Sequence, residues 1–92
     1  MASPVDVRIY ATGSCPYCHM AENLLRGKGV QPRILRVDHS PSLRQEMLRL
    51  SKGRRTVPQV FIGERHIGGY DDLSALERQG RLDALLADAE AS

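Results

Sequence analysis

The chain has 92 residues, and its thirteen lysines and arginines against eleven acidic residues give a formal net charge of +2. This length predicts one domain with a single core, and the near balance of charges argues against a nucleic-acid-binding surface. No apolar run approaches the roughly 20 residues of a membrane span, and residues 1–6 lack the basic and apolar segments of a signal peptide. We therefore expect a monomeric, cytoplasmic protein that binds neither nucleic acid nor a membrane.

The first third of the chain predicts a strand, a helix and a second strand. Apolar and polar residues alternate from Val5 to Tyr10, which indicates a strand with one buried face, formed by Val5, Val7 and Ile9. A helix is expected from Cys15 or Pro16 to Gly27 or Gly29, where glycine suits a left-handed cap, and its apolar stripe consists of Met20, Ala21, Leu24 and Leu25. The short apolar segment Arg33–Asp38 predicts a second strand, parallel to the first through a right-handed crossover.

The middle of the chain predicts a second helix and a hairpin. Ser40-Pro41 is a typical helix start, and the helix ends at Gly53 after burying Leu43, Met47 and Leu50. Two short strands, Gln59–Ile62 and His66–Gly68, are then joined around Gly63-Glu64.

The last third predicts two more helices. One is capped by Asp71 or Asp72, carries Leu73 and Leu76 and stops near Gly80; the other carries Leu82, Leu85, Leu86 and Ala89. The order β-α-β-α-β-β-α-α predicts an α/β fold in which helices flank a four-stranded mixed sheet. We expect a single domain over residues 1–92, with its core at about residues 5–89.

Both cysteines of the chain, Cys15 and Cys18, lie where the first strand gives way to the first helix. A helix start offers unpaired backbone N–H groups and a partial positive charge, which stabilise a thiolate. With Cys15 as the N-cap, Pro16 takes the first helical position and Cys18 the third, whose N–H points back at the Cys15 sulfur. The two cysteines are one helical turn apart, so the pair is predicted to form and break a disulfide with little backbone movement.

A structural disulfide and half of a zinc site are the other interpretations of this pair. A bridge that closes so short a loop removes little chain entropy from the unfolded state, so it contributes little stability. A closed zinc site requires four ligands, and beyond the two cysteines the chain offers only three scattered histidines, His19, His39 and His66. We therefore favour a redox function and expect no metal.

Three separated segments match one protein family: Cys15-Pro16-Tyr17-Cys18, Thr56-Val57-Pro58 and Gly68-Gly69-Tyr70-Asp71-Asp72. In this order and on this pattern of elements, the chain resembles a dithiol (class I) glutaredoxin of the thioredoxin fold from about Val5 to Leu86. Thioredoxins themselves usually carry Trp before a Cys-Gly-Pro-Cys motif, whereas this chain has no Trp and places Ser14 there. The resemblance implies that Cys15 is the attacking thiolate and Cys18 the resolving thiol.

The resemblance also implies a glutathione-binding site. A cis peptide between Val57 and Pro58, preceded by Thr56, would face the cysteines, and the main chain of Val57 would pair with the extended tripeptide. The γ-glutamyl end carries both charges, and it would meet the N–H groups and carboxylates of a helix start at Gly69, Tyr70, Asp71 and Asp72. Without the family, Gly68-Gly69 would be an ordinary turn and Asp72 a helix cap.

The glycyl carboxylate of glutathione needs a cation. Members of the family often carry Lys three residues before the first cysteine, where this chain has Thr12. Arg54 and Arg55 are the remaining candidates, because arginine can hold a carboxylate with two parallel hydrogen bonds. A solvated basic turn is the alternative interpretation of either arginine. Tyr17 is expected to be an exposed ring beside the reactive sulfur.

The function that the resemblance implies is glutathione-dependent thiol–disulfide exchange. The enzyme would reduce protein–glutathione mixed disulfides and protein disulfides, and so serve electron transport, deglutathionylation and cell redox homeostasis. Glutathione would be the reductant, regenerated through NADPH by a separate glutathione reductase. The alternative is an iron–sulfur cluster carrier in which two chains and two glutathiones hold the cluster. Relatives with that role usually have Gly or Ser after the first cysteine, so Pro16 argues against it.

Overall fold

The structure, a computed structural model, describes residues 6–91. The elements follow the predicted order: β1 (Val7–Ala11), α1 (Pro16–Gly27), β2 (Arg33–Arg36), α2 (Pro41–Leu50), β3 (Gln59–Ile62), β4 (Arg65–Gly68), α3 (Tyr70–Arg78) and α4 (Leu82–Ala91). Val5, which was expected in the first strand, lies outside the described residues. Within residues 6–91, no helix combines the length and the apolar character needed to cross a membrane.

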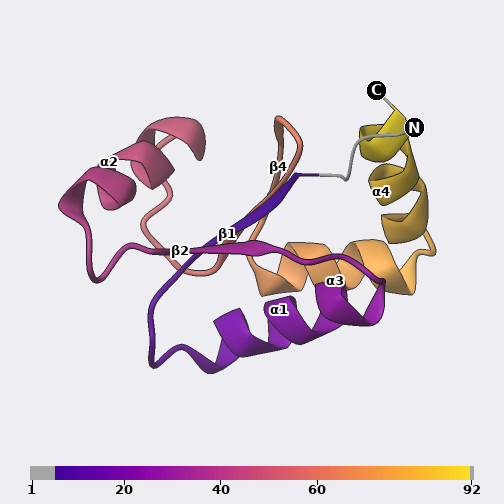
Figure 1. Cartoon of the computed structure of the whole chain (residues 1–92), viewed down its shortest axis with the longest axis horizontal. Coiled ribbons are helices and arrows are strands. Elements are labelled where there is room, and N and C mark those ends of the chain that lie inside the picture. Colours follow the sequence, from indigo (N-terminus) through magenta and orange to yellow (C-terminus); the bar gives the residue numbers. More distant parts are fainter. Residues whose placement is uncertain (1–5, 92) are drawn as a thin grey trace.

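The four strands form one mixed sheet in the order β2-β1-β3-β4. β1 and β2 are parallel, with Ile9 aligned with Ile34, as the predicted crossover through α1 requires. β3 runs antiparallel to both β1 and β4. Figure 1 shows α1 and α3 together on one side of the sheet and α2 on the other. The predicted four-stranded mixed sheet flanked by helices is therefore confirmed.

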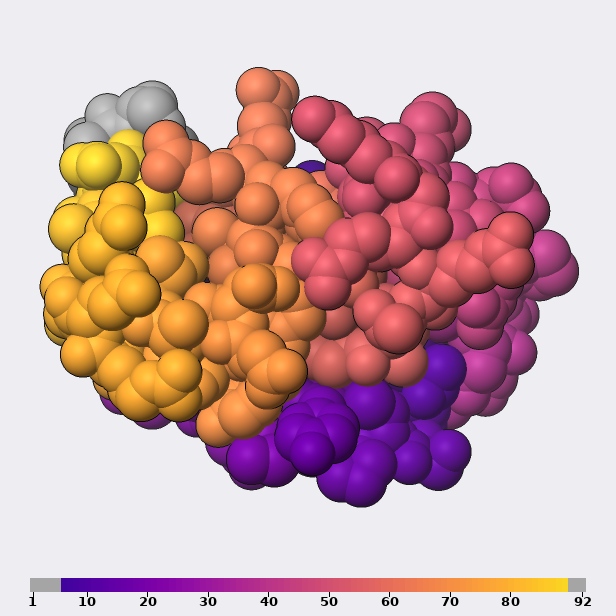
Figure 2. Space-filling model, turned by 180° about the vertical axis from the view of Figure 1, so that it is seen from behind, coloured from indigo at the N-terminus to yellow at the C-terminus, as the bar shows by residue number. Residues whose placement is uncertain are grey.

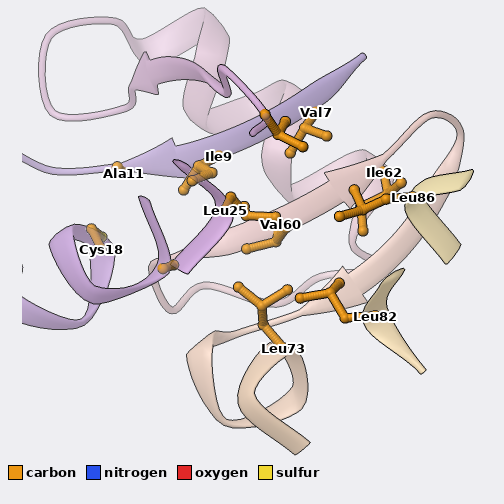
Figure 3. Packing of buried hydrophobic residues seen from close by; sticks show 12 residues of the cluster. Val7, Ile9, Ala11, Cys18, Leu25, Val60, Ile62, Leu73, Leu82 and Leu86 are labelled. Carbon is orange, nitrogen blue, oxygen red and sulfur yellow. The ribbon is translucent and has the colours of Figure 1, made fainter. Parts of the chain in front are cut away.

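The larger part of the core lies between the sheet and the helices α1, α3 and α4. Figure 3 shows its side chains projecting from β1 and β3 toward those helices, with Cys18 at the end nearest Ala11. The fully or nearly buried members of this cluster are Val7, Ile9, Ala11, Cys18, Ala21, Leu25, Val30, Val60, Ile62, Leu73, Leu82 and Leu86. The resolving cysteine of the predicted pair is thus part of the core.

A second, smaller cluster lies under α2 and consists of Tyr10, Val37, Met47 and Phe61. The Tyr10 ring meets that of Phe61 edge-on, with centroids 5.5 Å apart. The prediction that the first strand buries only one face is therefore wrong. Val7 and Ile9 are buried, as the alternation of apolar and polar residues predicts. However, α2 covers the other face of the sheet, so Tyr10 is completely buried as well.

Two residues assigned to buried helical stripes are exposed. Met20 in α1 is 44% exposed and Leu50 in α2 is 38% exposed. The buried face of α1 is centred on Cys18, Ala21 and Leu25, and Met20 lies roughly 200° around the helix from Cys18. Leu50 is the last residue of α2, and neither buried cluster includes it.

The predicted left-handed cap at the end of α1 is confirmed, whereas the predicted start of α3 is wrong. Gly29 has φ of 80°, and the N–H groups of Gly29 and Val30 donate back to carbonyls in the last turn of α1. The N-cap of α3 is Gly69 rather than either aspartate. Asp72 is the third residue of the helix, and from there its carboxylate accepts a hydrogen bond from the Gly69 N–H at 3.1 Å.

Candidate active site

Cys15 caps the start of α1 with its side chain. Its backbone is extended, Pro16 follows as the first helical residue, and the Cys18 N–H donates a hydrogen bond to the Cys15 sulfur at 3.1 Å. Both cysteines are free thiols, and Cys15 is partly exposed. This geometry confirms the predicted N-cap, and it directs an unpaired N–H group of the helix start at the sulfur.

Cys18 lies one turn inside the helix and is only 4% exposed. Burial, followed by a side-chain hydrogen bond with Cys15, raises the pKa of the Cys18 thiol to about 12. Cys18 is therefore a protonated thiol at neutral pH.

The loop before β3 places a cis peptide bond against the cysteines. The bond between Val57 and Pro58 is cis, as the resemblance implied. The Cys15 thiol donates to the Val57 carbonyl oxygen with a sulfur–oxygen distance of 3.8 Å, which joins two segments 42 residues apart in the sequence. A ligand bound through the main chain of Val57 would consequently lie next to the Cys15 sulfur.

A cleft of about 440 Å³ opens beside this contact. On the face shown in Figure 2, the violet residues at the start of α1 adjoin the red segment that precedes β3 and the orange start of α3. The cleft is lined by Tyr17, Arg54, Thr56, Val57, Pro58, Gly69, Tyr70, Asp71 and Asp72. The structure thus brings together every residue expected to bind glutathione except Arg55, which is exposed and does not line the cleft.

Two aromatic rings flank the cleft. Tyr17 is 58% exposed, as expected of a ring beside the reactive sulfur, and its centroid lies 6.0 Å from that of Tyr70 with the planes tilted by 33°. The pair spans from α1 to α3, so it forms an apolar edge on a cleft whose other groups are mostly polar.

The start of α3 forms the acidic end of the cleft. Asp71 and Asp72 lie in the first helical turn, and the Arg54 guanidinium is 3.5 Å from the Asp72 carboxylate. Gly68 is needed beside them, because its φ is 121° and a Cβ atom there would collide with the Asp72 carboxylate. Arg54 therefore lies at the end assigned to the γ-glutamyl group, not at the opposite end where a glycyl carboxylate was expected.

Thr12 does not line the cleft. It borders a separate hollow of about 220 Å³ on the Cys18 side of the first turn, together with Ala11, Gly13, Cys18, His19, Glu22, Ile34 and Arg36. The position that often carries a lysine in relatives is thus occupied by a short neutral side chain in this hollow.

A polar contact that the sequence did not suggest holds the loop before Cys15. The Gly13 N–H donates to the Asp38 carboxylate at 3.2 Å, and Arg36 holds the same carboxylate at 2.7 Å. The Arg36 guanidinium keeps the pKa of Asp38 well below its usual range, so this anchor is ionised at neutral pH. The one available signal was topological, because the carboxyl ends of parallel neighbours such as β1 and β2 meet at the same edge of a sheet.

Within residues 6–91, no group of three or more histidine, cysteine or acidic side chains is arranged to hold a metal ion. The site instead consists of two unequal thiols at a helix start, a cis-proline loop and a cleft with charged walls. These features on a four-stranded mixed sheet define a thioredoxin-fold protein with a dithiol site.

Comparison with known proteins specifies the family. The glutaredoxin family model matches residues 7–67. The chain is 54% identical over 81 residues to a glutaredoxin from Pseudomonas aeruginosa, covering 88% of this chain and 95% of that protein, and 52% identical over 81 residues to glutaredoxin 3 from Escherichia coli K12, covering 88% and 96%. The chain belongs to the glutaredoxin family, as the three motifs implied.

Solved structures agree with this assignment. The solution structure of a glutaredoxin from Brucella melitensis has a TM-score of 0.78 at 50% identity and covers 91% of this chain and 90% of that one. The crystal structure of a buckwheat glutaredoxin–glutathione complex has a TM-score of 0.83 at 29% identity, covering 95% and 81%. The thioredoxin fold is thereby confirmed, and membership of the family implies thiol–disulfide oxidoreductase activity.

Proposed function

We propose that the protein catalyses glutathione-dependent reduction of protein–glutathione mixed disulfides and of protein disulfides. The observation that carries this proposal is the position of the Cys15 sulfur, which caps a helix and lies 3.8 Å from the Val57 carbonyl oxygen, where the residues of the cleft converge. The buckwheat relative was solved as a complex with glutathione, which supports glutathione as the reductant here.

Glutathione would lie across the cleft with its sulfur at Cys15. The Val57 carbonyl accepts a hydrogen bond from the Cys15 thiol, and a thiolate cannot donate one, so ionisation of Cys15 would leave this carbonyl free for the ligand main chain. The N–H groups at the start of α3 would hold the γ-glutamyl carboxylate, and Asp71 would meet the ammonium group. Arg55 has no ion-pair partner among the described residues, so it is the better candidate for the glycyl carboxylate.

The exchange needs no reagent besides glutathione. The Cys15 thiolate attacks the glutathione sulfur of the mixed disulfide, a Cys15–glutathione bond forms, and the substrate sulfur leaves with the electron pair and takes up a proton. A second glutathione thiolate then attacks the glutathione sulfur on Cys15, which releases glutathione disulfide and restores the Cys15 thiolate. The net reaction reduces the substrate to a thiol and oxidises one free glutathione, which leaves as glutathione disulfide together with the glutathione of the mixed disulfide.

For a protein disulfide, Cys18 would complete the reaction. Cys15 first forms a mixed disulfide with the substrate protein, and Cys18 then attacks the Cys15 sulfur, so that the substrate leaves and a Cys15–Cys18 disulfide remains. Two glutathiones reduce that disulfide. Burial raises the pKa of Cys18 and hides it from the substrate, whereas Cys15 is partly exposed, which favours first attack by Cys15. Cys18 gives up its proton as it attacks, and the departing substrate sulfur takes up a proton.

The proposal extends to the setting of the protein. We propose a single-domain cytoplasmic monomer whose partners are glutathione, glutathionylated or disulfide-containing proteins and, indirectly, glutathione reductase with NADPH. No observation within residues 6–91 favours the alternative of an iron–sulfur cluster carrier, and Pro16 after the first cysteine argues against it.

The test is reduction of a small glutathione mixed disulfide, coupled through glutathione reductase to NADPH oxidation. The wild-type chain should be active and Cys15→Ser inactive. Arg55→Ala should raise KM for the mixed disulfide with little change in kcat, whereas Arg78→Ala, an exposed arginine in α3, should change neither. A wild-type chain that is inactive with glutathione but reduces disulfides with another thiol would overturn the proposal.

A further inference from the structure

Gln59 is a fully buried polar residue in a strand whose other members are apolar. Its exposed fraction is 0%, and every residue of β3 is buried. A buried carboxamide that lacks partners is strongly destabilising, so its hydrogen bonds must be found inside the protein. Its amide nitrogen lies 2.9 Å from the Thr56 carbonyl oxygen and 3.2 Å from the Thr56 hydroxyl, and its amide oxygen lies 2.7 Å from His66 Nε2.

The direction of these hydrogen bonds follows from the chemistry of the partners. The Thr56 carbonyl only accepts, so the NH₂ group of Gln59 must face it and the amide oxygen must face His66. His66 Nε2 must therefore carry a hydrogen and donate it. Burial, followed by the charge of Arg54, lowers the pKa of His66, so the imidazole is neutral at pH 7 with its hydrogen on Nε2. Its ring also packs on Phe61, with centroids 4.8 Å apart.

This chain of hydrogen bonds ends at the floor of the cleft. The Thr56 carbonyl and the Val57 N–H belong to one planar trans peptide, in which the two groups point in opposite directions. Because Gln59 holds the carbonyl toward the protein interior, the Val57 N–H is aimed away from it. Among the described residues this N–H has no hydrogen-bond partner, although Val57 lines the cleft beside the Cys15 sulfur.

We propose that Gln59, itself oriented by His66, is a positioning residue that aims and polarises the Val57 N–H for the main chain of the bound thiol ligand. The inference rests on the proposed function, because it assigns glutathione as that ligand. A donor from Gln59 to the Thr56 carbonyl increases the polarity of the whole peptide group and strengthens the Val57 N–H as a donor. Gln59 and His66 do not themselves line the cleft, and Gln59 reaches it through its hydrogen bonds to Thr56, the residue that shares a peptide group with Val57.

Two substitutions test the positioning role, with kcat and KM measured for a small glutathione mixed disulfide. Gln59→Leu removes every side-chain hydrogen bond of position 59 and keeps an apolar side chain in the core. KM should rise about threefold to tenfold, the effect expected for one weakened neutral hydrogen bond, while kcat at saturation stays within about twofold. His66→Phe keeps a ring against Phe61 but loses the donor, and KM should rise by a smaller factor.

Controls separate positioning from loss of stability. Leu86→Ala opens a cavity beside Ile62, at the end of the core opposite Cys18 (Figure 3), and its KM should remain at the wild-type value even where its unfolding midpoint falls as far as that of Gln59→Leu. If Gln59→Leu does not fold, His66→Phe decides alone. An active wild-type protein with unchanged KM in both variants, or an equal rise in Leu86→Ala, would overturn the positioning role and leave the proposed function intact. A wild-type protein inactive with glutathione would overturn both.

Discussion

Cys15 and Cys18 carry the same functional group, but their surroundings give them different chemistry. Cys15 is partly exposed and accepts a hydrogen bond from the helix start, whereas Cys18 packs in the core beside Ala11 and Ala21. A substrate sulfur can therefore reach Cys15, and Cys18 can reach only Cys15. We infer that one residue attacks the substrate and the other resolves the product.

Serine substitutions should separate these two roles. Cys18→Ser should still exchange glutathione with small mixed disulfides, because that route needs one sulfur and a second glutathione, but it should lose most activity on protein disulfides. Cys15→Ser should lose both activities, since a hydroxyl is a far weaker nucleophile without an adjacent base. The measurement is the glutathione-coupled rate on both substrates. Equal losses in the two variants on the small substrate would contradict the assignment.

Single residues could be predicted from the sequence when their partners are close in the chain. Cys15 as the N-cap followed from its adjacency to Pro16 and Cys18, and the grouping of Thr56, Val57 and Pro58 followed from a family motif. Other contacts depend on which strands become neighbours and on which rotamers the buried side chains adopt. Examples are the hydrogen bonds between Gly13 and Asp38 and between Gln59 and His66. No local pattern carries that information.

Whole helices and strands could be predicted because the periodicity of apolar residues reflects burial. The centre of each buried face could not be predicted in this way. The apolar stripe predicted for α1 did not include Cys18. Because Cys18 is buried, the buried face of this helix lies away from Met20. In α2 the spacing of Leu43, Met47 and Leu50 is helical, yet only Met47 is fully buried. A helix that contacts the sheet along a short length buries the middle of its stripe, and the sequence alone does not give that length.

Alanine substitutions in α2 should show this difference in stability. Met47→Ala should lower the free energy of unfolding by about 2–5 kcal/mol, because it leaves a cavity among Tyr10, Val37 and Phe61. Leu50→Ala should change it by no more than about 1 kcal/mol, because that side chain is 38% exposed and belongs to neither buried cluster. Urea denaturation at neutral pH measures both. Similar losses in the two variants would mean that α2 is buried along its whole apolar stripe.

At the scale of the whole molecule, two buried groups should make the fold sensitive to alkali. Burial raises the pKa of Cys18 from 9.0 to about 12, and burial with a hydrogen bond from Tyr10 to Glu46 raises the pKa of Tyr10 from 10.0 to about 12. The unfolded chain loses these protons at lower pH than the native protein does. The stability that these two protonated groups contribute is therefore fully present below pH 9, and it is lost progressively as the pH rises toward 12.

Denaturant unfolding between pH 7 and 11 measures this loss. Tyr10→Phe should flatten the upper part of the decline and Cys18→Ser the lower part, although both variants start from a lower stability at neutral pH. Tyr17→Phe is the matched control, because that side chain is exposed and removal of its hydroxyl should leave the slope unchanged. A decline equally steep in Tyr10→Phe would show that the buried phenol is not its source.

Charged residues are unevenly distributed around the cleft. The segment from α2 to the cis proline carries five basic residues, Arg44, Arg49, Lys52, Arg54 and Arg55, and only Arg54 forms an ion pair with a described residue. Its one acidic residue, Glu46, accepts a hydrogen bond from Tyr10. The opposite wall begins with Asp71 and Asp72 at the start of α3. A client protein at Cys15, as proposed above, would therefore have on one side of the cleft a segment with four basic residues that lack ion-pair partners among the described residues.

This asymmetry predicts a preference among glutathionylated peptides. A peptide with acidic residues beside the modified cysteine should react with a kcat/KM on the order of tenfold above that of a peptide with basic residues at low ionic strength, and the ratio should fall as salt is added. Replacing Arg49 and Lys52 together by Gln should reduce the ratio without altering turnover of a small neutral mixed disulfide. Replacing Arg78 and Arg81 by Gln makes the same change in net charge at α3 and its C-terminal end, so the ratio should stay as in the wild type. Equal effects of the two double variants would mean that net charge, not the basic segment before the cis proline, sets the preference.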